Sequence, residues 1–450
     1  MTKLYRSLEF GLYLFIFLLP WQTRWIWHIG QLNDGYWEYG SFSLYGTELL
    51  LWGLLGLFLI VLIKSGGRRL LSVTELRQRF GQAHIRIYWL FVAVVLASGL
   101  SVFWAMDQSV AYHHWVRMLE GAALMVMLLH LRFDTLKLAI VWIASAVVQS
   151  GIGIVQFLTQ YVGANKWLGL AQHDAAIGGS IVLETASERW LRAYGSLPHP
   201  NILAGFLVIA ILLLFYVSMR FALRRQSRML IMGSLAVMTL ALFFTFSRSA
   251  WLAIILSFAG VMLWLRRRGN ASQRQIFYSL LVIMAVIVAI FGTTLSGALE
   301  ARLVGEQRLE VESIRLRVTF AQQAMTVIQN TRGLGTGIGN YTLGVYGFVN
   351  DNWPFWYYQP VHNIYFLVLA EVGILGLGLF LAAILSLLRA ALRQLKSLET
   401  LFLSLGLCSL LIIGMVDHYT WTLYFGILTF WLVIGLMLRQ ISPPNAELKD

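Results

Sequence analysis

Long apolar stretches recur along the whole chain and dominate its pattern. A helix needs about 20 mostly apolar residues to cross a lipid bilayer. Stretches of about that length cover residues 8–27, 44–63, 87–105, 112–130, 137–159, 200–219, 229–246, 249–265, 276–294, 361–386, 399–416 and 420–438. This pattern predicts an all-α fold: a polytopic integral membrane protein with about twelve transmembrane helices, in which residues 1–450 form a single transmembrane domain.

Two connecting segments, residues 161–198 and 295–360, are too long for simple turns. Long loops in compact proteins are usually functional or disordered. Within the second loop, residues 313–329 carry apolar side chains at helical spacing, namely Ile314, Val318, Ala321, Met325 and Ile328. That spacing predicts an amphipathic helix at the membrane surface. We therefore expect the second loop to contain short helices and the chemistry to lie on this side of the membrane.

Composition and charge narrow the class further. Hydrophobic residues make up 58% and charged residues 12% of the chain, whereas soluble domains carry about 25% charged residues. Most of the 34 Lys and Arg fall in the terminal segments and in the short loops on the side opposite the two long loops. The positive-inside rule therefore predicts that both termini are cytoplasmic. The net charge of +13 is thus a topology signal, and we expect no nucleic-acid partner.

Two familiar kinds of site are excluded by the sequence. Cys408 is the single cysteine and lies inside an apolar run, so an intramolecular disulfide or a cysteine-based metal site cannot form. The glycine-rich segment RGLGTGIGNY, residues 332–341, lacks the strand–helix context of a nucleotide-binding loop. We expect these glycines to allow a tight backbone path near an active site, or simply a turn. No metal and no cofactor is expected.

Arginines on the outer side are the first candidates for ligand binding. Arg192 precedes the sixth predicted span, Arg248 lies in the turn between the seventh and eighth, and two more, Arg315 and Arg317, lie in the second long loop. A guanidinium group binds phosphate through two parallel hydrogen bonds, so arginines near a bilayer surface can form an anion site. The alternative is that each arginine extends to the lipid headgroups.

Three predicted helices begin on the outer side beside polar residues that suit a ligand site. Their starts are His199-Pro200-Asn201, Ser247-Arg248-Ser249 and His362-Asn363. The N-terminus of a helix presents free N–H groups and a partial positive charge, which favour anions. Three such ends beside the arginines would suit a diphosphate, provided that they converge in space.

His362 is the candidate general base, because an imidazole with a pKa of about 6.5 exchanges protons near neutrality. A structural role at the start of the helix is the alternative. Arg248 and Arg317 complete the candidate catalytic set. The candidate substrate contacts are Arg192, His199, Asn201, Arg315, Asn363 and Tyr341.

Four segments of the chain resemble the O-antigen ligase and polymerase superfamily. They are RAYGSLPHPNILAGFL (192–207), FSRSAWLA (246–253), SIRLRVTFAQQAMTVIQNTRGLGTGIGNY (313–341) and HNIYFLVLAEVGILGLG (362–378). The resemblance implies a GT-C-like fold in the bacterial inner membrane, with the long loops and the active site on the periplasmic side. It also implies the inverting transfer of a glycan from undecaprenyl diphosphate to an acceptor hydroxyl, without a metal or cofactor.

By the same resemblance, Arg248 and Arg317 would hold the donor diphosphate, and His362 would deprotonate the acceptor hydroxyl. The chain departs from the family pattern at two places. Ala321 stands where family members have an aromatic residue, although a phenylalanine lies beside it, and the usual proline before the glycine segment is missing. These departures leave open whether Arg315 or Arg317 is the arginine of the site.

The predicted function is that of an O-antigen ligase, whose partners are a glycan donor on undecaprenyl diphosphate, a lipid A–core or similar acceptor, and membrane lipids. An O-antigen or exopolysaccharide polymerase, which uses the same chemistry on another acceptor, is the alternative. A solute transporter of the bicarbonate type is the third hypothesis, but few ionisable residues lie inside the predicted spans. The sequence does not specify the sugar, the acceptor or the oligomeric state.

Overall fold

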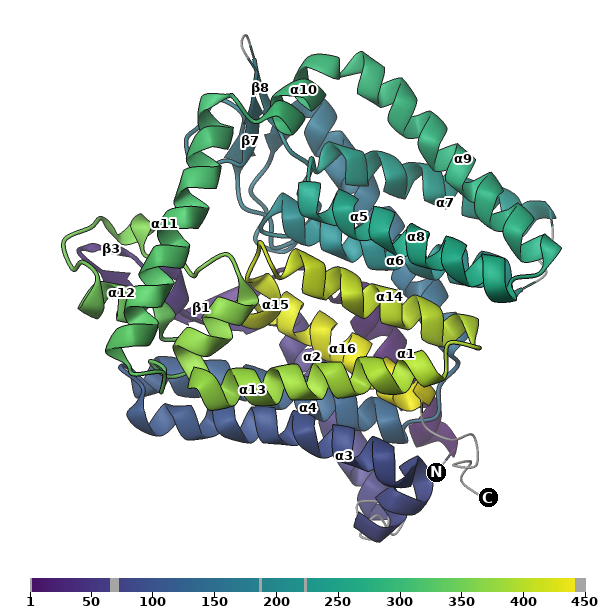
Figure 1. The fold of residues 1–450 in the computed structure, drawn as a ribbon, viewed down its shortest axis with the longest axis horizontal. Helices are drawn as coiled ribbons and strands as arrows, with labels where there is room; N and C mark the ends of the chain where they lie inside the picture. The colour runs from purple at the N-terminus through teal and green to yellow at the C-terminus, as the bar shows by residue number, and fades with distance from the viewer. Residues whose placement is uncertain (1, 65–72, 186–187, 222–224, 442–450) are drawn as a thin grey trace.

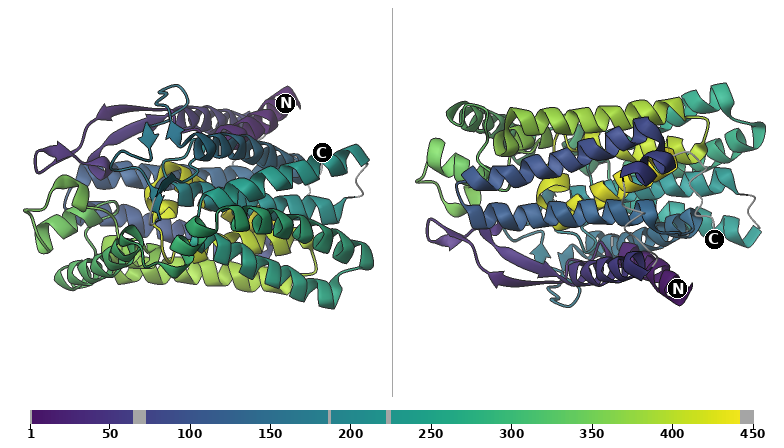
Figure 2. Two further views of the ribbon diagram at one scale, coloured as in Figure 1. Left: turned by 90° about the horizontal axis from the view of Figure 1, so that it is seen from above. Right: turned by 90° about the horizontal axis from the view of Figure 1, so that it is seen from below.

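The computed structural model describes residues 2–64, 73–185, 188–221 and 225–441. Most of the long helices lie roughly along one direction and form an elongated bundle (Figure 2). In chain order the bundle contains α1 (Thr2–Leu18), α2 (Gly46–Lys64), α3 (Val73–Leu100), α4 (Gln108–His130), α5 (Thr135–Thr159), α6 (Pro200–Arg220), α7 (Arg225–Phe244), α8 (Arg248–Arg268), α9 (Ala271–Thr294), α13 (Ile364–Arg393), α14 (Leu398–Ile413) and α16 (Tyr424–Ile441).

The described part of the chain holds nine helices that are long and apolar enough to cross a membrane: α2, α3, α5, α6, α7, α8, α9, α13 and α16. The three other predicted spans coincide with α1, α4 and α14, so each predicted apolar stretch contains a helix. The chain is therefore an all-α polytopic membrane protein, as the apolar pattern predicts. The starts of α6, α8 and α13 lie within three residues of the predicted starts.

The two central helices of the bundle are α6 and α16. Every residue of α6 from Pro200 to Met219 is buried, and a helix that is apolar on all sides belongs in the interior of a bundle. It packs against α5, α7, α8 and α14, while α16 packs against α4 and α14. By contrast, α9 buries Phe277, Leu280 and Met284 and exposes most of its other side chains, as expected for a helix that faces lipid.

The first predicted span, 8–27, is wrong beyond Leu18, where α1 ends. Pro20 lacks a backbone N–H and disfavours helix in the residue before it. The tryptophan-rich segment that follows forms strand β1 (Arg24–His28), which pairs antiparallel with β4 (Phe42–Tyr45). Three more two-stranded pairs are β2 (Gln31–Leu32) with β3 (Gly35–Tyr36), β5 (Tyr161–Val162) with β6 (His173–Asp174), and β7 (Val182–Glu184) with β8 (Arg189–Leu191).

The segment between α9 and α13 forms helices α10 (Ser296–Val304), α11 (Arg308–Asn330) and α12 (Tyr341–Phe348), followed by the 3-10 turn η3 (Phe355–Tyr357). Two further 3-10 turns are η1 (Glu38–Gly40) and η2 (Ser101–Trp104), and a single helical turn, α15 (Tyr419–Thr422), precedes α16. The hairpin of β1 lies at the same end of the bundle as α11 and α12 (Figure 1). The start of α1 and the end of α16 lie toward the other end. That both termini are cytoplasmic stays a prediction.

Helix α11 confirms the predicted helix over 313–329 and extends it at both ends. Three members of the predicted apolar stripe are turned outward: Ile314, Val318 and Met325 are 47%, 55% and 44% exposed. The buried face instead carries Phe320 and Val327. A helix that turns apolar side chains outward suits a position at the membrane surface.

Helix α13 is interrupted at Gly373, whose φ of 81° and ψ of −174° are open to glycine alone. The glycine-rich segment packs into this interruption: the Thr336 N–H donates to the Ala370 carbonyl and the Ile374 N–H to the Gly333 carbonyl, both at 2.9 Å. A Cβ on Gly335 would lie 2.4 Å from the Glu371 carbonyl oxygen. The glycines thus allow a tight backbone path, the first of the two predicted roles.

Candidate active site

His362 lies two residues before α13 and packs against α11. Its imidazole is stacked on the ring of Phe320, with centroids 5.6 Å apart and planes 6° apart. The Nδ1 atom of His362 is buried and has no hydrogen-bond partner among the described residues. Burial lowers the pKa of His362 below 6.5, and the charge of Arg317 adds to this, whereas Asp417 opposes it. A neutral imidazole with a free nitrogen can accept a proton.

Three further ionisable residues surround His362: His199, His418 and Asp417. The rings of His362 and His418 meet edge to face with centroids 5.1 Å apart. Burial lowers the pKa of His199 and of His418. Burial opposes ionisation of Asp417, but the histidines and a hydrogen bond from Asn201 outweigh it and lower the pKa of that carboxyl. The site therefore contains one carboxylate among three neutral imidazoles at neutral pH.

The sequence reasoning did not single out Asp417 or His418. Both lie in the segment MVDHYTW, at the boundary between two predicted spans. A carboxylate beside an imidazole in so apolar a region is itself a signal of function, because charge near the membrane interior is costly. That signal was available in the sequence.

Arg192 and Asn201, two predicted substrate contacts, are engaged within the protein. Arg192 is buried; its Nε donates to the Thr245 carbonyl at 2.6 Å and its Nη2 to Asn201 Oδ1 at 2.8 Å. The Nδ2 atom of Asn201 in turn donates to Asp417 Oδ2 at 3.0 Å. These hydrogen bonds connect the turn before α8 to Asp417. Both side chains are therefore held in place by hydrogen bonds within the protein.

Arg248 begins α8 and belongs to a second group of charges. Its Nη2 lies 3.1 Å from Glu310 Oε2, and the other oxygen of Glu310 pairs with Arg302. The Nε of Arg302 donates to the Phe246 carbonyl at 2.7 Å, and Phe246 has a positive φ of 46°. Arg302 thus holds the turn that presents Arg248. Sequence reasoning missed it because nothing distinguishes it from the other charged residues of the long loop.

Arg317, and not Arg315, faces the site. Arg317 precedes Phe320 by three residues and so shares its face of α11. Burial and the charge of Arg248 lower the pKa of Arg317, and its Nε has no hydrogen-bond partner among the described residues. Arg315 is instead 78% exposed at its side chain and lies 3.8 Å from Glu312. Of the two arginines, Arg317 thus shares the face of α11 that carries Phe320, whereas Arg315 is turned outward.

The three predicted helix starts differ in their free N–H groups. Asn363 caps α13 by accepting hydrogen bonds from the Tyr365 and Phe366 N–H groups, and the His199 Nδ1 accepts from the Asn201 N–H in α6. Within the described residues, no side chain caps α8, which begins at Arg248. The N-terminus of α8 is therefore the one of the three best suited to an anion.

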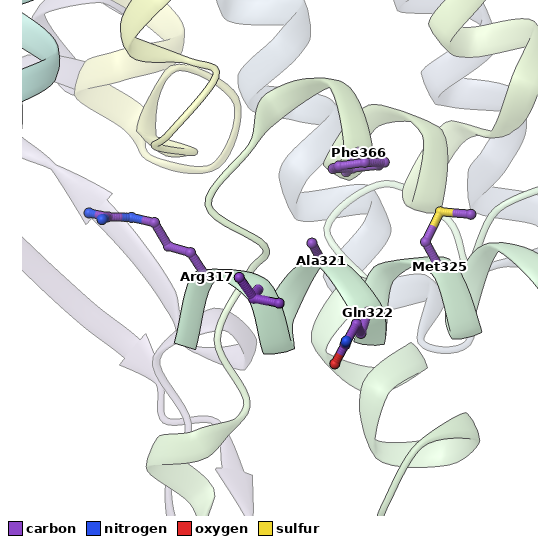
Figure 3. A pocket seen from close by; sticks show the side chains of 6 residues that line it. Arg317, Ala321, Gln322, Met325 and Phe366 are labelled. Carbon is purple, nitrogen blue, oxygen red and sulfur yellow. The ribbon is translucent and has the colours of Figure 1, made fainter. Parts of the chain in front are cut away.

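An apolar groove of about 500 Å³ lies between α11 and α13 and ends at Arg317. Ala321 and Met325 of α11 face Phe366 of α13 across it, and the Arg317 side chain extends away from them (Figure 3). The small side chain of Ala321 leaves space that an aromatic residue would fill. By contrast, Tyr341, another predicted contact, is 1% exposed, and its hydroxyl donates to the Phe320 carbonyl at 3.3 Å. Tyr341 therefore contacts the buried side of α11.

The fold and this site define a class: a membrane-embedded helical protein with clustered arginines and histidines at one end of its bundle. Residues 233–381 match the family model described as O-antigen ligase. The matched segment contains Arg248, Arg317 and His362, whereas Asp417 lies outside it. No curated protein matches the chain. The match supports an O-antigen ligase or polymerase type of function and, in general, lipid-linked glycan substrates.

Proposed function

We propose that the protein is a glycosyltransferase of the O-antigen ligase type, acting on the periplasmic face of the bacterial inner membrane. It moves a glycan from undecaprenyl diphosphate to a hydroxyl of lipid A–core or a similar acceptor, with inversion and without a metal. The observation that carries this proposal is the position of His362: a neutral imidazole with a free, buried nitrogen close to Arg317.

The donor diphosphate binds at the arginine cluster, which we define as Arg192, Arg248, Arg302 and Arg317. These cations interact electrostatically within the cluster, and the carboxylates of Glu310 and Asp417 interact with them. The excess of positive charge suits a group with two or three negative charges. Arg192 and Arg302 hold the turn before α8, so Arg317, Arg248 and the free N–H groups of α8 are the direct contacts.

The isoprenoid chain of the donor fits the apolar groove between α11 and α13. The groove is open on one side and ends at Arg317, so a lipid chain in it would place its headgroup at the cluster. Each buried CH₂ group contributes about 0.8 kcal/mol, so even partial burial of a long chain gives substantial binding energy. This arrangement positions the diphosphate without fixing the glycan attached to it.

The chemistry requires little beyond position and charge. The acceptor oxygen forms a bond to C1 of the donor sugar while the bond between C1 and the phosphate oxygen breaks. The electron pair of that bond leaves with undecaprenyl diphosphate, whose charge Arg248 and Arg317 stabilise. The hydroxyl proton moves to the imidazole of His362, and Asp417 stabilises the imidazolium that forms. A positioned base contributes about 10²–10⁴-fold to such a reaction.

Reconstitution with a defined donor and acceptor tests this function. Purified protein in liposomes would receive an oligosaccharide on undecaprenyl diphosphate, with or without lipid A–core. A single donor block on lipid A–core, absent with His362→Ala, is the expected product. A ladder on the polyprenyl carrier without lipid A–core would instead identify a polymerase. Solute flux without glycan transfer would indicate a transporter.

A further inference from the structure

A second cavity, of about 440 Å³, adjoins His362 on the side of the N-terminal hairpin. Its walls come from β1, η1, residues 162–181 of the first long loop, residues 194–199 and the segment that holds Asp417 and His418, together with Gln359 and His362. We call it the hairpin cavity. Its volume lies within the range of about 300–1,000 Å³ that is typical of small-molecule sites.

The hairpin cavity differs from the arginine cluster in charge. Among the described residues that line it, the groups charged at neutral pH are Arg24, Glu38 and Asp417, because burial keeps its histidines neutral. One cation therefore accompanies two anions. In the arginine cluster four cations accompany the carboxylates of Glu310 and Asp417, which leaves an excess of positive charge. A diphosphate is attracted to the positive charge of the arginine cluster. The hairpin cavity therefore suits an uncharged polar ligand.

The polar groups of the hairpin cavity suit a ligand with several hydroxyls. Arg24 Nη1 lies 2.7 Å from Glu38 Oε1, and both side chains keep about a third of their surface exposed. Although burial opposes ionisation of Glu38, the Arg24 guanidinium holds the pKa of that carboxyl below its ordinary value. A carboxylate accepts hydrogen bonds from hydroxyls, and a guanidinium donates to their oxygens. Tyr39 packs edge to face on His418, with ring centroids 6.2 Å apart, so aromatic surface lies beside these groups.

We propose that the hairpin cavity binds the acceptor sugar and that Arg24 and Glu38 select it through hydroxyls that do not react. This inference rests on the proposed function. His362 lines the hairpin cavity, while its ring packs on Phe320 of α11, the helix that carries Arg317. An acceptor in the cavity thus presents its hydroxyl to His362 from the side away from α11.

The location of the selecting residues supports the same assignment. Arg24 and Glu38 lie in the first long connection after α1, outside residues 233–381, where the family model matches. The matched segment carries Arg248, Arg317 and His362, the groups that the reaction itself needs. The residues that select the acceptor, Arg24 and Glu38, then lie in a separate part of the chain. They can vary without disturbing the transfer chemistry.

The test is the double variant Arg24→Gln/Glu38→Gln in the liposome assay. Removing both charges together leaves neither unpaired, and a partly exposed ion pair contributes little to folding. We expect the KM for lipid A–core to rise about tenfold or more, the loss typical of hydrogen bonds to charged groups, with the donor KM unchanged. The matched control is Arg308→Gln/Glu184→Gln, which removes another Arg–Glu pair, at 3.0 Å, that does not line the cavity. We expect this control variant to leave the KM for the acceptor and the KM for the donor unchanged.

An unchanged acceptor KM in the double variant overturns the proposal, and so does a rise in the donor KM, which would place the donor sugar in the cavity. A binding measurement separates this from the proposed function. Lipid-free core oligosaccharide would be titrated by calorimetry into wild-type protein and the double variant. Binding by wild type alone supports a glycan site even if no transfer occurs, in which case the proposed function fails by itself. Equal binding, or none, contradicts the cavity proposal.

Discussion

The imidazole of His362 lies parallel to the ring of Phe320, 6° from coplanar and with centroids 5.6 Å apart. This stacking joins the start of α13 to the middle of α11. Because Arg317 lies one turn before Phe320 on the same face, the contact also sets the position of the base relative to the arginine. Helix α11 therefore carries Arg317 and also orients His362.

Phe320→Ala is expected to lower kcat by about 10- to 100-fold, because small displacements of a reacting group cost rates of that size. The donor KM should change little, since Arg317 remains. The control is Phe348→Ala on α12, whose side chain is 39% exposed and which should retain full rate. Initial rates over a range of donor concentrations measure both constants. Equal rates for the two variants would show that the stacking does not orient the base.

Arg317→Ala is expected to abolish measurable transfer, whereas Arg315→Ala is expected to retain it. The two residues lie on the same helix, but Arg317 is largely buried beside Arg248 while Arg315 is exposed. Loss of one charge-stabilising donor costs about 10²–10³-fold in rate. Arg317→Lys keeps the charge without the planar fork and should give intermediate activity. A loss of transfer with Arg315→Ala alone would reverse the assigned register.

The rate is expected to fall at acid pH with an apparent pKa below 6.5. Burial holds the pKa of His362 below that value, so the base stays neutral above it and is lost only as it gains a proton. The charge of Asp417 raises this pKa, and Asp417→Asn removes that charge. The acid limb of kcat/KM should therefore move to lower pH, with a reduced maximum rate. The exposed Asp351→Asn is the control, and a shift toward higher pH would contradict the assignment.

Arg302→Met is expected to destabilise the protein by about 3 kcal/mol, the lower end of the cost of breaking a buried ion pair, because Glu310 keeps Arg248 as a partner. The Phe246 carbonyl also loses its donor. Arg308→Met breaks a pair in which the arginine is 73% exposed and should cost at most about 1 kcal/mol. Thermal unfolding in detergent compares them. Equal shifts in Tm would mean that Arg302 does not hold the turn.

Gly373→Ala is expected to lower the Tm markedly, because its positive φ alone costs about 1–3 kcal/mol in another residue. An added Cβ would also lie 2.5 Å from the Gly333 carbonyl oxygen. On the same helix, a Cβ on Gly378 meets no described atom within 4 Å, so Gly378→Ala should leave the Tm unchanged or slightly higher. If both variants unfold at the wild-type temperature, the packing of the glycine-rich segment into the interruption of α13 does not stabilise the fold.

Much of the bundle could be predicted because crossing a bilayer imposes a length and an apolar composition that sequence shows directly. The starts of α6 and α13 were also predictable, since Pro200 and Asn363 suit the first turn and the cap. The end of α1 could not be predicted, because the apolar tryptophans of β1 continue the apolar pattern of the helix. Strands of two to five residues, paired within loops, carry too few positions for a periodic signal.

The site was predictable only in part. Arg248, Arg317 and His362 could be singled out as polar residues at predicted helix starts or on an amphipathic helix. Their convergence depends on tertiary packing, which no local pattern contains. For the same reason the sequence could not show that Arg192 is buried and donates to the Thr245 carbonyl.

If the protein transfers a glycan from undecaprenyl diphosphate by means of His362 and Arg317, it must release undecaprenyl diphosphate. This release can be measured directly. Protein in liposomes would receive a donor labelled in its diphosphate together with lipid A–core, and the freed lipid would be counted over time. We expect release that matches glycan transfer one to one in the wild type and in Arg315→Ala. We expect no release with His362→Ala or Arg317→Ala. Release at the wild-type rate by His362→Ala, or glycan transfer without release of the diphosphate lipid, would contradict the proposed function.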